Sequence, residues 1–464
     1  MHKTPIFEML EGYKKKKRIS FAMPGHKGGR GLGNRAGIFS LDVTELPDTD
    51  NLYVLGGAVA EARKRAAAFF GAQETFFLTN GTTGGIYTML AAVCRRGDRV
   101  LVNRGCHGSV INACIVLGLT PVFAEHALIP EFSALNAVTP AEIERCMDTD
   151  IRAVLITTPN FYGVCADIGG IAGVAHRYGV PLLVDEAHGA HYAADPEVFP
   201  ETALRSGADL VVQSAHKTLN AVNQTSYLHV KSDLVDKRRL RECVRMLQTS
   251  SPSYVMAGFL DSARAELGGE NNWRTTYEAC VRLKTELSRK TDVKVMTRKT
   301  DGVFDADETR IVLNFSAYDV TGYAILDILR TKYNIDIEMA DLYNIVCIAT
   351  AANTREEIKS LGRAVQEITA GLFPRKKELF SAAIPRVEVV KAPTAAFDAA
   401  GEWIPLAQSA GRTVKSMVVV YPPGIPVLFP GARVTEAALE YLQNYIAAGA
   451  EVIGMEDDNL YIVK

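Results

Sequence analysis

The sequence predicts an α/β fold whose sheet is mostly parallel and carries helices on both faces. Short apolar runs rich in β-branched residues alternate with helical patterns, and repeated strand, loop and helix units build such sheets. The polar residues that follow each run should then collect along one edge of the sheet. At 464 residues the chain is too long for one ordinary core, so a large domain with smaller ones is expected.

Composition narrows the class of partner. A formal net charge of −2 and 48% hydrophobic residues are typical of a globular protein. Its electrostatic field is not strong enough to bind nucleic acid or a membrane surface. Small molecules are the expected partners. The basic block Lys14–Arg18 is interpreted as a solvated face. The eight cysteines are scattered singly, which predicts no metal site and suits a reducing cytosol. With neither a signal peptide nor a membrane-spanning run, the chain is expected to be cytoplasmic.

Four domains are expected. Residues 1–40 form an N-terminal arm and residues 41–270 a large domain that holds the repeated units. A change to a polar helix from Trp273 starts a small α+β domain over residues 271–374. Pro374-Arg375-Lys376-Lys377 then resembles a linker to a C-terminal domain over residues 375–464.

The first polar strand end suggests an anion site. Thr75–Thr79 is a strand by its β-branched and aromatic content, and the turn Asn80–Gly85 precedes an apolar helix expected from Ile86 to Cys94. Free N–H groups and the dipole at the start of a helix favour a phosphate, and the hydroxyls of Thr82 and Thr83 can add bonds. The alternative is an N-capped helix after a tight turn.

The second strand end carries a histidine. The strand Asp98–Val102 leads to His107, whose imidazole could stack on an aromatic cofactor ring. His107 could equally cap the helix Ser109–Leu117, and on these residues alone the cap is favoured.

Two further buried strands lead to a carboxylate. Ala153–Thr158 and Pro181–Val184 are connected by a helix from Ile168, and the second strand ends at Asp185. A carboxylate at this place could cap a helix, but it is also the group that holds a pyridine nitrogen protonated. His188, a short way along the loop, could orient that carboxylate or the cofactor ring.

The last strand end carries a lysine. Lys217 follows the strand Ala208–Val212 in a loop, and a lysine amine there can form a Schiff base with an aldehyde cofactor. Ser214 and His216 flank it with hydrogen-bonding groups suited to a phosphate. The alternative is a solvated surface lysine. A strand returning at Tyr227–Val230 follows.

The second half offers weaker signals. The hydroxyl-rich turn Thr249–Tyr254 starts a helix and on composition is a capping turn. Ile335–Asp341 brings two or three carboxylates onto a loop or strand. Those acids could face a basic substrate or be ordinary exposed loop acids.

The four strand ends together indicate one cofactor. A phosphate cradle, a ring-stacking imidazole, a ring-nitrogen carboxylate and a Schiff-base lysine are the parts needed to bind pyridoxal 5′-phosphate. The chain also resembles the short form of the Orn/Lys/Arg decarboxylase family, whose members are fold-type I pyridoxal-phosphate enzymes. The resemblance runs over nearly the whole chain in these motifs: FAMPGHKGG, TELP, FFLTNGTTGG, CHGS, DEAHGAH, QSAHKTL, TSSPSY, YPPGIP and FPGA.

The resemblance implies roles for these residues. Lys217 would be the Schiff-base lysine, Asp185 the partner of the ring nitrogen and His107 the stacking residue. His188 would lie beside the cofactor. The phosphate would be held by Gly81, Thr82, Thr83, Ser214 and His216. In this family two subunits complete each active site, so a homodimer or larger homo-oligomer is implied, with Ser250 and Ser251 reaching the phosphate of a neighbouring chain. Glu338 is the candidate for recognising the distal charge of the substrate.

The implied activity is decarboxylation of arginine, lysine or ornithine to the amine and carbon dioxide, feeding polyamine synthesis. The proton donor is left open between Lys217 and His188. Departures from the family pattern bear on the substrate: Asn220 and Asn223 follow the lysine motif, and Tyr53 stands where relatives place histidines. Two alternatives stay open, namely another reaction on the same cofactor, such as transamination or cysteine desulfuration, and a silent cofactor-binding protein.

Overall fold

The computed structural model describes residues 3–16, 37–54, 56–269, 272–375, 383–421 and 424–464. The motif FAMPGHKGG, residues 17 and 18 of the basic block, and the first two prolines of YPPGIP lie outside these ranges. The chain divides into two compact units, each described by itself: Met1–Val93 with Pro181–Asn272, and Cys94–Val180 with Trp273–Lys464. The four domain boundaries expected from the sequence stay a prediction.

The first unit is built on four buried strands. In order across the sheet they are β1 (Glu74–Leu78), β10 (Ser226–Val230), β9 (Leu210–Ser214) and β8 (Leu182–Asp185). β8 and β9 are parallel, whereas β10 is antiparallel to both of its neighbours. Because β10 runs against β1 and β9, the carboxyl ends of β1, β9 and β8 meet at the same edge. The strands expected from the sequence are all present, and β10 adds an antiparallel element to the sheet.

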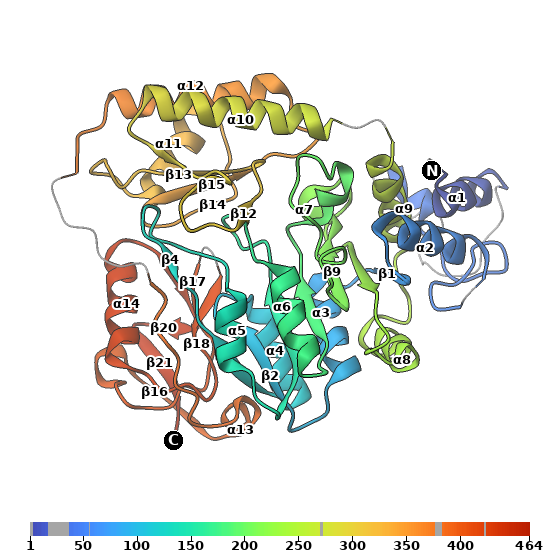
Figure 1. Cartoon of the computed structure of the whole chain (residues 1–464), viewed down its shortest axis with the longest axis horizontal. Helices are drawn as coiled ribbons and strands as arrows, with labels where there is room; N and C mark the ends of the chain where they lie inside the picture. Colours follow the sequence, from blue (N-terminus) through green and yellow to red (C-terminus); the bar gives the residue numbers. More distant parts are fainter. Residues whose placement is uncertain (1–2, 17–36, 55, 270–271, 376–382, 422–423) are drawn as a thin grey trace. The chain divides into compact units, whose positions relative to one another are not determined.

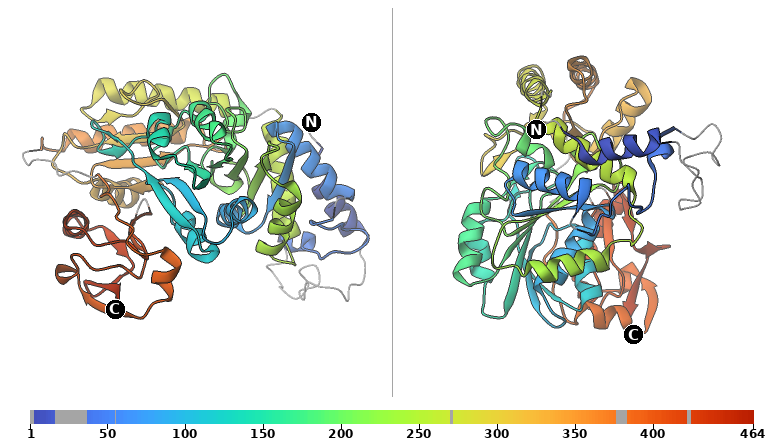
Figure 2. Two further views of the ribbon diagram at one scale, coloured as in Figure 1. Left: turned by 60° about the horizontal axis from the view of Figure 1, so that its bottom comes forward. Right: turned by 90° about the vertical axis from the view of Figure 1, so that its right-hand side faces the viewer.

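Helix α3 (Gly81–Val93) lies directly on these strands. A Cβ atom at Gly85 would stand 2.4 Å from Cγ2 of Val212 on β9, so only glycine allows this close approach. Helix α2 (Gly57–Phe70) ends at Gly71 in a left-handed conformation. Figure 2 shows the N-terminal helix α1 (Pro5–Lys15) packed with α2 and α9 (Tyr254–Leu267). Helices α1 and α8 (Lys237–Leu247) are not among the expected elements.

The second unit begins with three parallel strands. They are β6 (Ile151–Thr157), β2 (Arg99–Asn103) and β3 (Thr120–Ala124), in that order. Parallel neighbours need a crossover, and the helices of this part are α4 (Gly108–Leu117), α5 (Pro140–Cys146) and α6 (Ile168–Arg177). This is the strand, loop and helix repetition that the sequence predicts.

A four-stranded antiparallel sheet follows in the second unit, as the expected α+β part. Its strands are, in order, β11 (Lys294–Val295), β13 (Arg310–Asn314), β15 (Asn344–Ile348) and β14 (Met339–Ala340). Figure 1 shows α10 and α12 side by side over these strands. The helices of this part are α10 (Trp273–Lys290), α11 (Gly322–Tyr333) and α12 (Arg355–Ala370).

The C-terminal part contains two small sheets, β16-β21-β20 and β18-β17-β19. Arg104, which follows β2, is buried and donates to the carbonyl oxygens of Pro426 and Val427, at 2.6 and 2.9 Å. The elements are α13 (Pro393–Asp398), β16 (Gly401–Pro405), β17 (Val418–Tyr421), β18 (Ile425–Leu428), α14 (Glu436–Ala447), β19 (Glu451–Ile453), β20 (Met455–Glu456) and β21 (Asn459–Val463). A guanidinium has five N–H donors and can therefore bond to several carbonyl oxygens at once. Through these bonds Arg104 connects the C-terminal part to strand β2.

Short elements complete the described chain: η2 (Gly37–Leu41), β4 (Leu128–Ile129), β5 (Ala134–Leu135), β7 (Val164–Cys165), η3 (Ala190–Ala194), α7 (Ala215–Thr218), β12 (Asp305–Ala306) and η4 (Leu406–Gln408). Within the described ranges, none of the helices has the length and apolar character needed to span a membrane.

Candidate active site

Lys217 contacts His188 in the first unit. Strand β9 ends at Ser214, and Lys217 then lies on the single helical turn α7 rather than in the expected loop. Its Nζ atom is 3.0 Å from Nε2 of His188, a residue that is only 4% exposed. Because β8 and β9 are parallel neighbours, the residues three positions beyond each strand end can meet. Lys217 itself is half-buried, and its contact with His188 favours the site interpretation over that of a solvated surface lysine.

Asp185 is the last residue of β8 and is 2% exposed. It lies opposite Val212 in the register with β9, so both side chains point to the face that α3 covers. Its Oδ1 atom accepts a hydrogen bond from the N–H of Ala187 at 3.1 Å. A buried carboxylate on this face, in the same strand end as His188, suits the predicted partner of a ring nitrogen.

A cluster of three buried hydroxyls joins α3 to the sheet. Oγ1 of Thr82 is 2.6 Å from Oγ of Ser214 and 2.6 Å from Oγ of Ser226. Ser226 donates in turn to the carbonyl oxygen of Gln213 at 2.7 Å. The predicted phosphate contacts Thr82 and Ser214 therefore already bond to each other. Ser226 is not among the predicted residues, and its position opposite Ser214 in the register is the signal that finds it.

The first turn of α3 presents free donors. The helix begins at Gly81, earlier than the expected Ile86, so the threonines belong to the helix itself. Gly81 has a φ of 67°, and its N–H donates to the carbonyl oxygen of Gln224 at 2.8 Å. The N–H groups of Thr82 and Thr83 have no acceptor within their own helix, and the Thr83 side chain is exposed. This turn is suited to an anion.

The remaining predicted phosphate contacts of the first unit lie on α7 and in the turn before α9. His216, on α7 beside Lys217, donates from Nδ1 to the carbonyl oxygen of Thr225 at 2.9 Å, and burial lowers its pKa. Ser250 and Ser251 are exposed in the turn before α9. The cap of α9 is Ser253, whose hydroxyl accepts from the N–H of Met256, which confirms the capping interpretation of this turn.

His107 lies in the second unit, immediately after β2. It is the N-cap of α4, and its Nδ1 atom accepts from the N–H of Ser109 at 3.2 Å. The capping interpretation is thus confirmed. The cap fixes the ring orientation and leaves the His107 side chain exposed. Its stacking on a cofactor stays a prediction.

The acidic segment around β14, also in the second unit, has its carboxylates in different environments. Asp341 is buried and accepts from the hydroxyl of Tyr162 at 2.7 Å and from the amide of Asn344 at 2.9 Å. Burial raises its pKa. Glu338 is exposed, and its carboxylate makes no hydrogen bond or ion pair in the part of the chain that the structure describes. Asp341 therefore has a structural role, and Glu338 is the available acid.

A buried polar chain crosses the opposite face of the first sheet. Oγ1 of Thr75 is 2.8 Å from Nδ1 of His229, and Nε2 of His229 is 3.1 Å from Oε1 of Gln213. Gln213 donates to Glu186 at 2.6 Å, and the N–H of Ala203 donates to the same carboxylate at 2.8 Å. Burial lowers the pKa of His229 to about 3 and raises that of Glu186 to about 8. The chain connects β1, β10 and β9 to the residue that follows Asp185.

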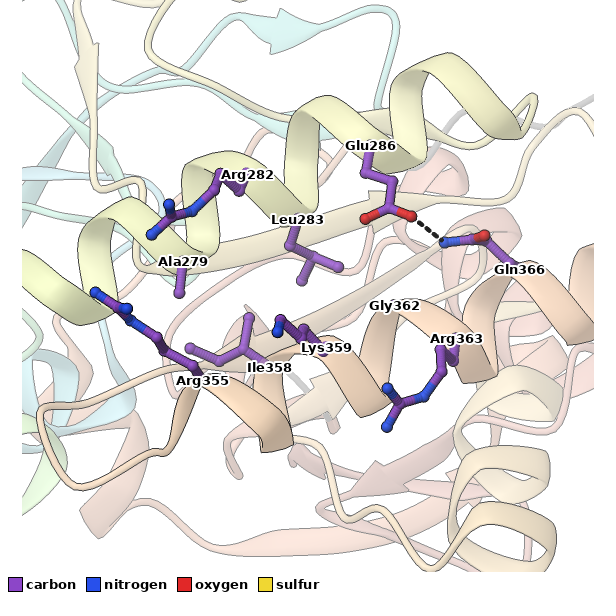
Figure 3. Close-up of a pocket in the computed structure, with 10 residues that line it drawn as sticks. All are labelled: Ala279, Arg282, Leu283, Glu286, Arg355, Ile358, Lys359, Gly362, Arg363 and Gln366. Atoms are coloured by element: carbon purple, nitrogen blue, oxygen red, sulfur yellow. Dashed lines mark hydrogen bonds between the residues drawn. The ribbon is translucent and has the colours of Figure 1, made fainter.

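A groove in the second unit contains none of the predicted site residues. It lies between α10 and α12 and has a volume of about 390 Å³ (Figure 3). Its cations are exposed, and Arg282 and Arg363 pair with Glu278 and Glu356 on their own helices.

The residues of the first unit fit pyridoxal 5′-phosphate. They supply an amine, a buried carboxylate and a helix N-terminus with hydroxyls, which match the aldehyde, the ring nitrogen and the phosphate. Oγ1 of Thr218, next to Lys217, is buried without a hydrogen-bond partner in the described residues. An unsatisfied buried hydroxyl beside the lysine is consistent with a polar ligand at this place.

The fold is that of the fold-type I pyridoxal-phosphate enzymes. The lysine decarboxylase LdcF of Francisella novicida superimposes with a TM-score of 0.85 at 19% identity, over 99% of this chain and 81% of that one.

Sequence comparison then gives the family. The model described as "Orn/Lys/Arg decarboxylase, major domain" matches residues 4–313, and the one described as "Orn/Lys/Arg decarboxylase, C-terminal domain" matches residues 375–459. An arginine decarboxylase of Bacillus anthracis is 34% identical over 100% of this chain and 97% of its own length. One of Bacillus subtilis is 32% identical over 100% and 98%. The chain therefore belongs to the Orn/Lys/Arg decarboxylase family, and the resemblance stated from its motifs is confirmed.

Proposed function

We propose that the chain is a pyridoxal-phosphate-dependent decarboxylase that converts a basic L-amino acid, arginine foremost, to the amine and carbon dioxide. The contact between Lys217 and His188, which follows the buried Asp185 by three residues, is the observation that carries this proposal. Arginine is favoured because relatives named arginine decarboxylase are 32 to 34% identical over the full chain, whereas relatives named lysine decarboxylase are 22 to 23% identical.

Lys217 and Asp185 are proposed to hold the two ends of the cofactor's reactive system. When bound, pyridoxal phosphate supplies a protonated ring that accepts the electrons released as the carboxylate leaves. The carboxylate of Asp185 is buried on the face that α3 covers, where it can keep a ring nitrogen protonated. The amine of Lys217 would hold the aldehyde of the cofactor.

His188 and Lys217 are the two candidates for the proton that the product carbon receives. At 3.0 Å they can exchange a proton directly, because the amine and the imidazole each have one state that donates and one that accepts. Burial of His188 keeps bulk water from competing with this exchange. We assign the final transfer to Lys217, with His188 setting its protonation state.

The phosphate is proposed to lie at the first turn of α3. The N–H groups of Thr82 and Thr83 and the Thr83 hydroxyl are the available donors, while the Thr82 and Ser214 hydroxyls fix the turn to the sheet. His216 donates from Nδ1 to Thr225, so its Nε2 atom can donate to the phosphate only when the ring is protonated. Ser250 and Ser251 are exposed and can serve the phosphate of a second copy in a homodimer or larger homo-oligomer.

Glu338 is proposed to bind the distal charge of the substrate. A carboxylate without a bond in the described chain can pair with a guanidinium in a bidentate manner, which would favour arginine over lysine. Replacing Glu338 by Gln should therefore raise KM for arginine more than it lowers kcat. Replacing the neighbouring exposed Asp336 by Asn is the matched control, because Asp336 lies 3.6 Å from Arg330 and is already paired.

The deciding experiment incubates the cofactor-loaded protein with arginine, lysine and ornithine in parallel. The expected result is carbon dioxide and amine in equal amounts, fastest with arginine and without a keto acid. Keto-acid formation would indicate a transaminase, and release of sulfide from cysteine would indicate a desulfurase. Turnover of none of these amino acids, despite bound cofactor, would leave a silent binding protein and reject the proposal.

A further inference from the structure

A small cationic pocket lies in the first unit beside the strand that leads into the cofactor-phosphate turn. Its volume is about 120 Å³. It is formed by the loop before α2, by Arg63 of α2, by β1 and by the last turns of α8. The residues that line it are Leu52, Tyr53, Arg63, Phe76, Phe77, Arg241, Val244, Arg245 and Gln248.

An unused donor lies in the wall of this pocket. Gln248, which follows α8, is 8% exposed, and its Oε1 atom accepts from the N–H of Thr79 at 2.9 Å. That bond fixes the orientation of the amide, because the backbone N–H of Thr79 can only donate. The Nε2 atom of Gln248 is buried and has no hydrogen-bond partner in the described residues. A buried amide donor of this kind requires an acceptor that the protein itself does not supply.

Three arginines surround the same space. Arg63 is 9% exposed, donates from Nε to the carbonyl oxygen of Thr75 at 2.9 Å and lies over the ring of Phe76. Burial lowers its pKa to about 10, so its charge is held at a cost. Arg241 is paired with Glu74. Arg245 is exposed and makes no ion pair within the described ranges.

The charges of the pocket are therefore unbalanced. Among the described residues that line it there are three cations and no carboxylate, and Glu74 offsets only one of them. We propose that this pocket binds a small inorganic oxyanion of the phosphate or sulfate type, held by Nε2 of Gln248 and the guanidinium groups of Arg63 and Arg245. A volume of about 120 Å³ accepts such an ion and excludes a nucleotide.

The position of the pocket gives the ion a consequence. The same Gln248 side chain holds the N–H of Thr79, and Nδ2 of Asn80 donates to the carbonyl oxygen of Leu247 at 3.4 Å. The end of α8 thus supports the two residues before Gly81. An ion that orders Gln248 stabilises the turn proposed for the cofactor phosphate, and the cofactor is released more slowly. This coupling rests on the proposed function, whereas the binding of the ion does not.

The test measures binding of radiolabelled inorganic phosphate to the full-length protein by equilibrium dialysis. The cofactor is first fixed by borohydride, so that its own phosphate site is filled. One saturable site per chain, from which sulfate displaces phosphate, is expected. Failure of borohydride to attach the cofactor would count against the proposed function, whereas absence of saturable phosphate binding to the loaded protein would overturn this inference alone.

Two variants locate the site. Gln248→Glu keeps the acceptor for Thr79 and replaces the amide donor by a carboxylate oxygen, so it should weaken phosphate binding by at least about tenfold. Arg245 is exposed, so Arg245→Gln should leave the fold intact. It should also weaken phosphate binding, which keeps the test valid if the first variant does not fold. In the wild type, phosphate should raise Tm and slow the release of unreduced cofactor, and both effects should be lost in the variants.

A second cationic surface provides the matched control. Arg355 lies in the groove between α10 and α12, where the cations are exposed (Figure 3). Arg355→Gln removes the same charge as Arg245→Gln and should leave phosphate binding unchanged. Equal weakening by both variants would show a non-specific effect of net charge and would overturn the proposal, as would unchanged binding in both pocket variants.

Discussion

Nζ of Lys217 lies 3.0 Å from Nε2 of His188, and the two residues stand three positions beyond the ends of two neighbouring parallel strands. At this distance only one of the two nitrogens can hold the shared proton. When the amine is charged, Nε2 must accept and the imidazole proton must be on Nδ1; when the amine is neutral, Nε2 can donate. The geometry therefore couples the protonation of the proposed anchoring lysine to that of a buried histidine.

Lys217 should be the residue that borohydride labels. Reduction of the cofactor-loaded protein followed by peptide mapping is expected to place the cofactor on the peptide that contains Lys217. Lys217→Arg should abolish this label and lower kcat/KM by about 10³-fold or more, because a guanidinium stays protonated and cannot add to the aldehyde. Label at another lysine would contradict the assignment. Lys231→Arg, which changes a lysine bonded to the carbonyl oxygen of Leu204, is the control.

His188 should affect turnover more than cofactor binding. His188→Gln removes the titrating group and keeps a polar side chain, so kcat is expected to fall about 10²- to 10⁴-fold while cofactor content is retained. A plot of kcat against pH should lose either its rise or its fall, because the variant has one titrating group fewer. His176→Gln, on the exposed side of α6, is the control and should behave as wild type. Loss of cofactor together with activity would instead assign His188 a role in binding.

Much of the site was accessible from the sequence because each part follows a strand with a strong signal. Asp185 comes directly after one short apolar run and Lys217 shortly after another, and parallel strands place such residues at one edge of a sheet. The start of helix α3 at Gly81 could not be predicted from the sequence. Glycine and threonine have low helix propensity, and packing against β9 makes them helical.

The chain of polar side chains from Thr75 to Glu186 could not be predicted from the sequence either. Its members are far apart in the sequence and meet only through the register of β1, β10 and β9. His229 and Gln213 look like ordinary strand residues in the sequence. Helix α8 was not predicted because its apolar face is narrow: Leu240, Cys243 and Val244 are buried, and the residues between them are mostly charged.

Glu186 should make stability depend on pH. Burial, the largest cause, raises its pKa from 4.5 to about 8 in the folded chain. The folded state therefore holds the proton between about pH 4.5 and pH 8 where the unfolded state has lost it, and the free energy of unfolding should fall as pH rises through this range. Urea unfolding at several pH values measures this slope, and a slope of opposite sign would contradict the assignment.

Glu186→Gln should reduce that slope and retain the fold. The neighbouring bonds can reverse, because Gln213 can turn its amide, neutral His229 can change tautomer and the Thr75 hydroxyl can donate or accept. Gln213→Leu cannot be accommodated in this way and leaves two buried polar groups unsatisfied, so it should cost roughly 1–3 kcal/mol for each group. Equal destabilisation by both variants would show that the chain cannot reverse.

Thr82 and Thr83 should separate stability from cofactor binding, although they are neighbours in sequence. The Thr82 hydroxyl is buried and bonds to Ser214 and Ser226. Thr82→Val removes it from a closed cluster and should lower the free energy of unfolding of the cofactor-free protein by about 1–3 kcal/mol. The Thr83 side chain is exposed, so Thr83→Val should change that free energy by less than about 0.5 kcal/mol. Its effect should instead be weaker cofactor binding, because it removes a phosphate donor. Urea unfolding of the cofactor-free proteins and a cofactor titration distinguish the two, and the opposite pattern would place the phosphate on Thr82.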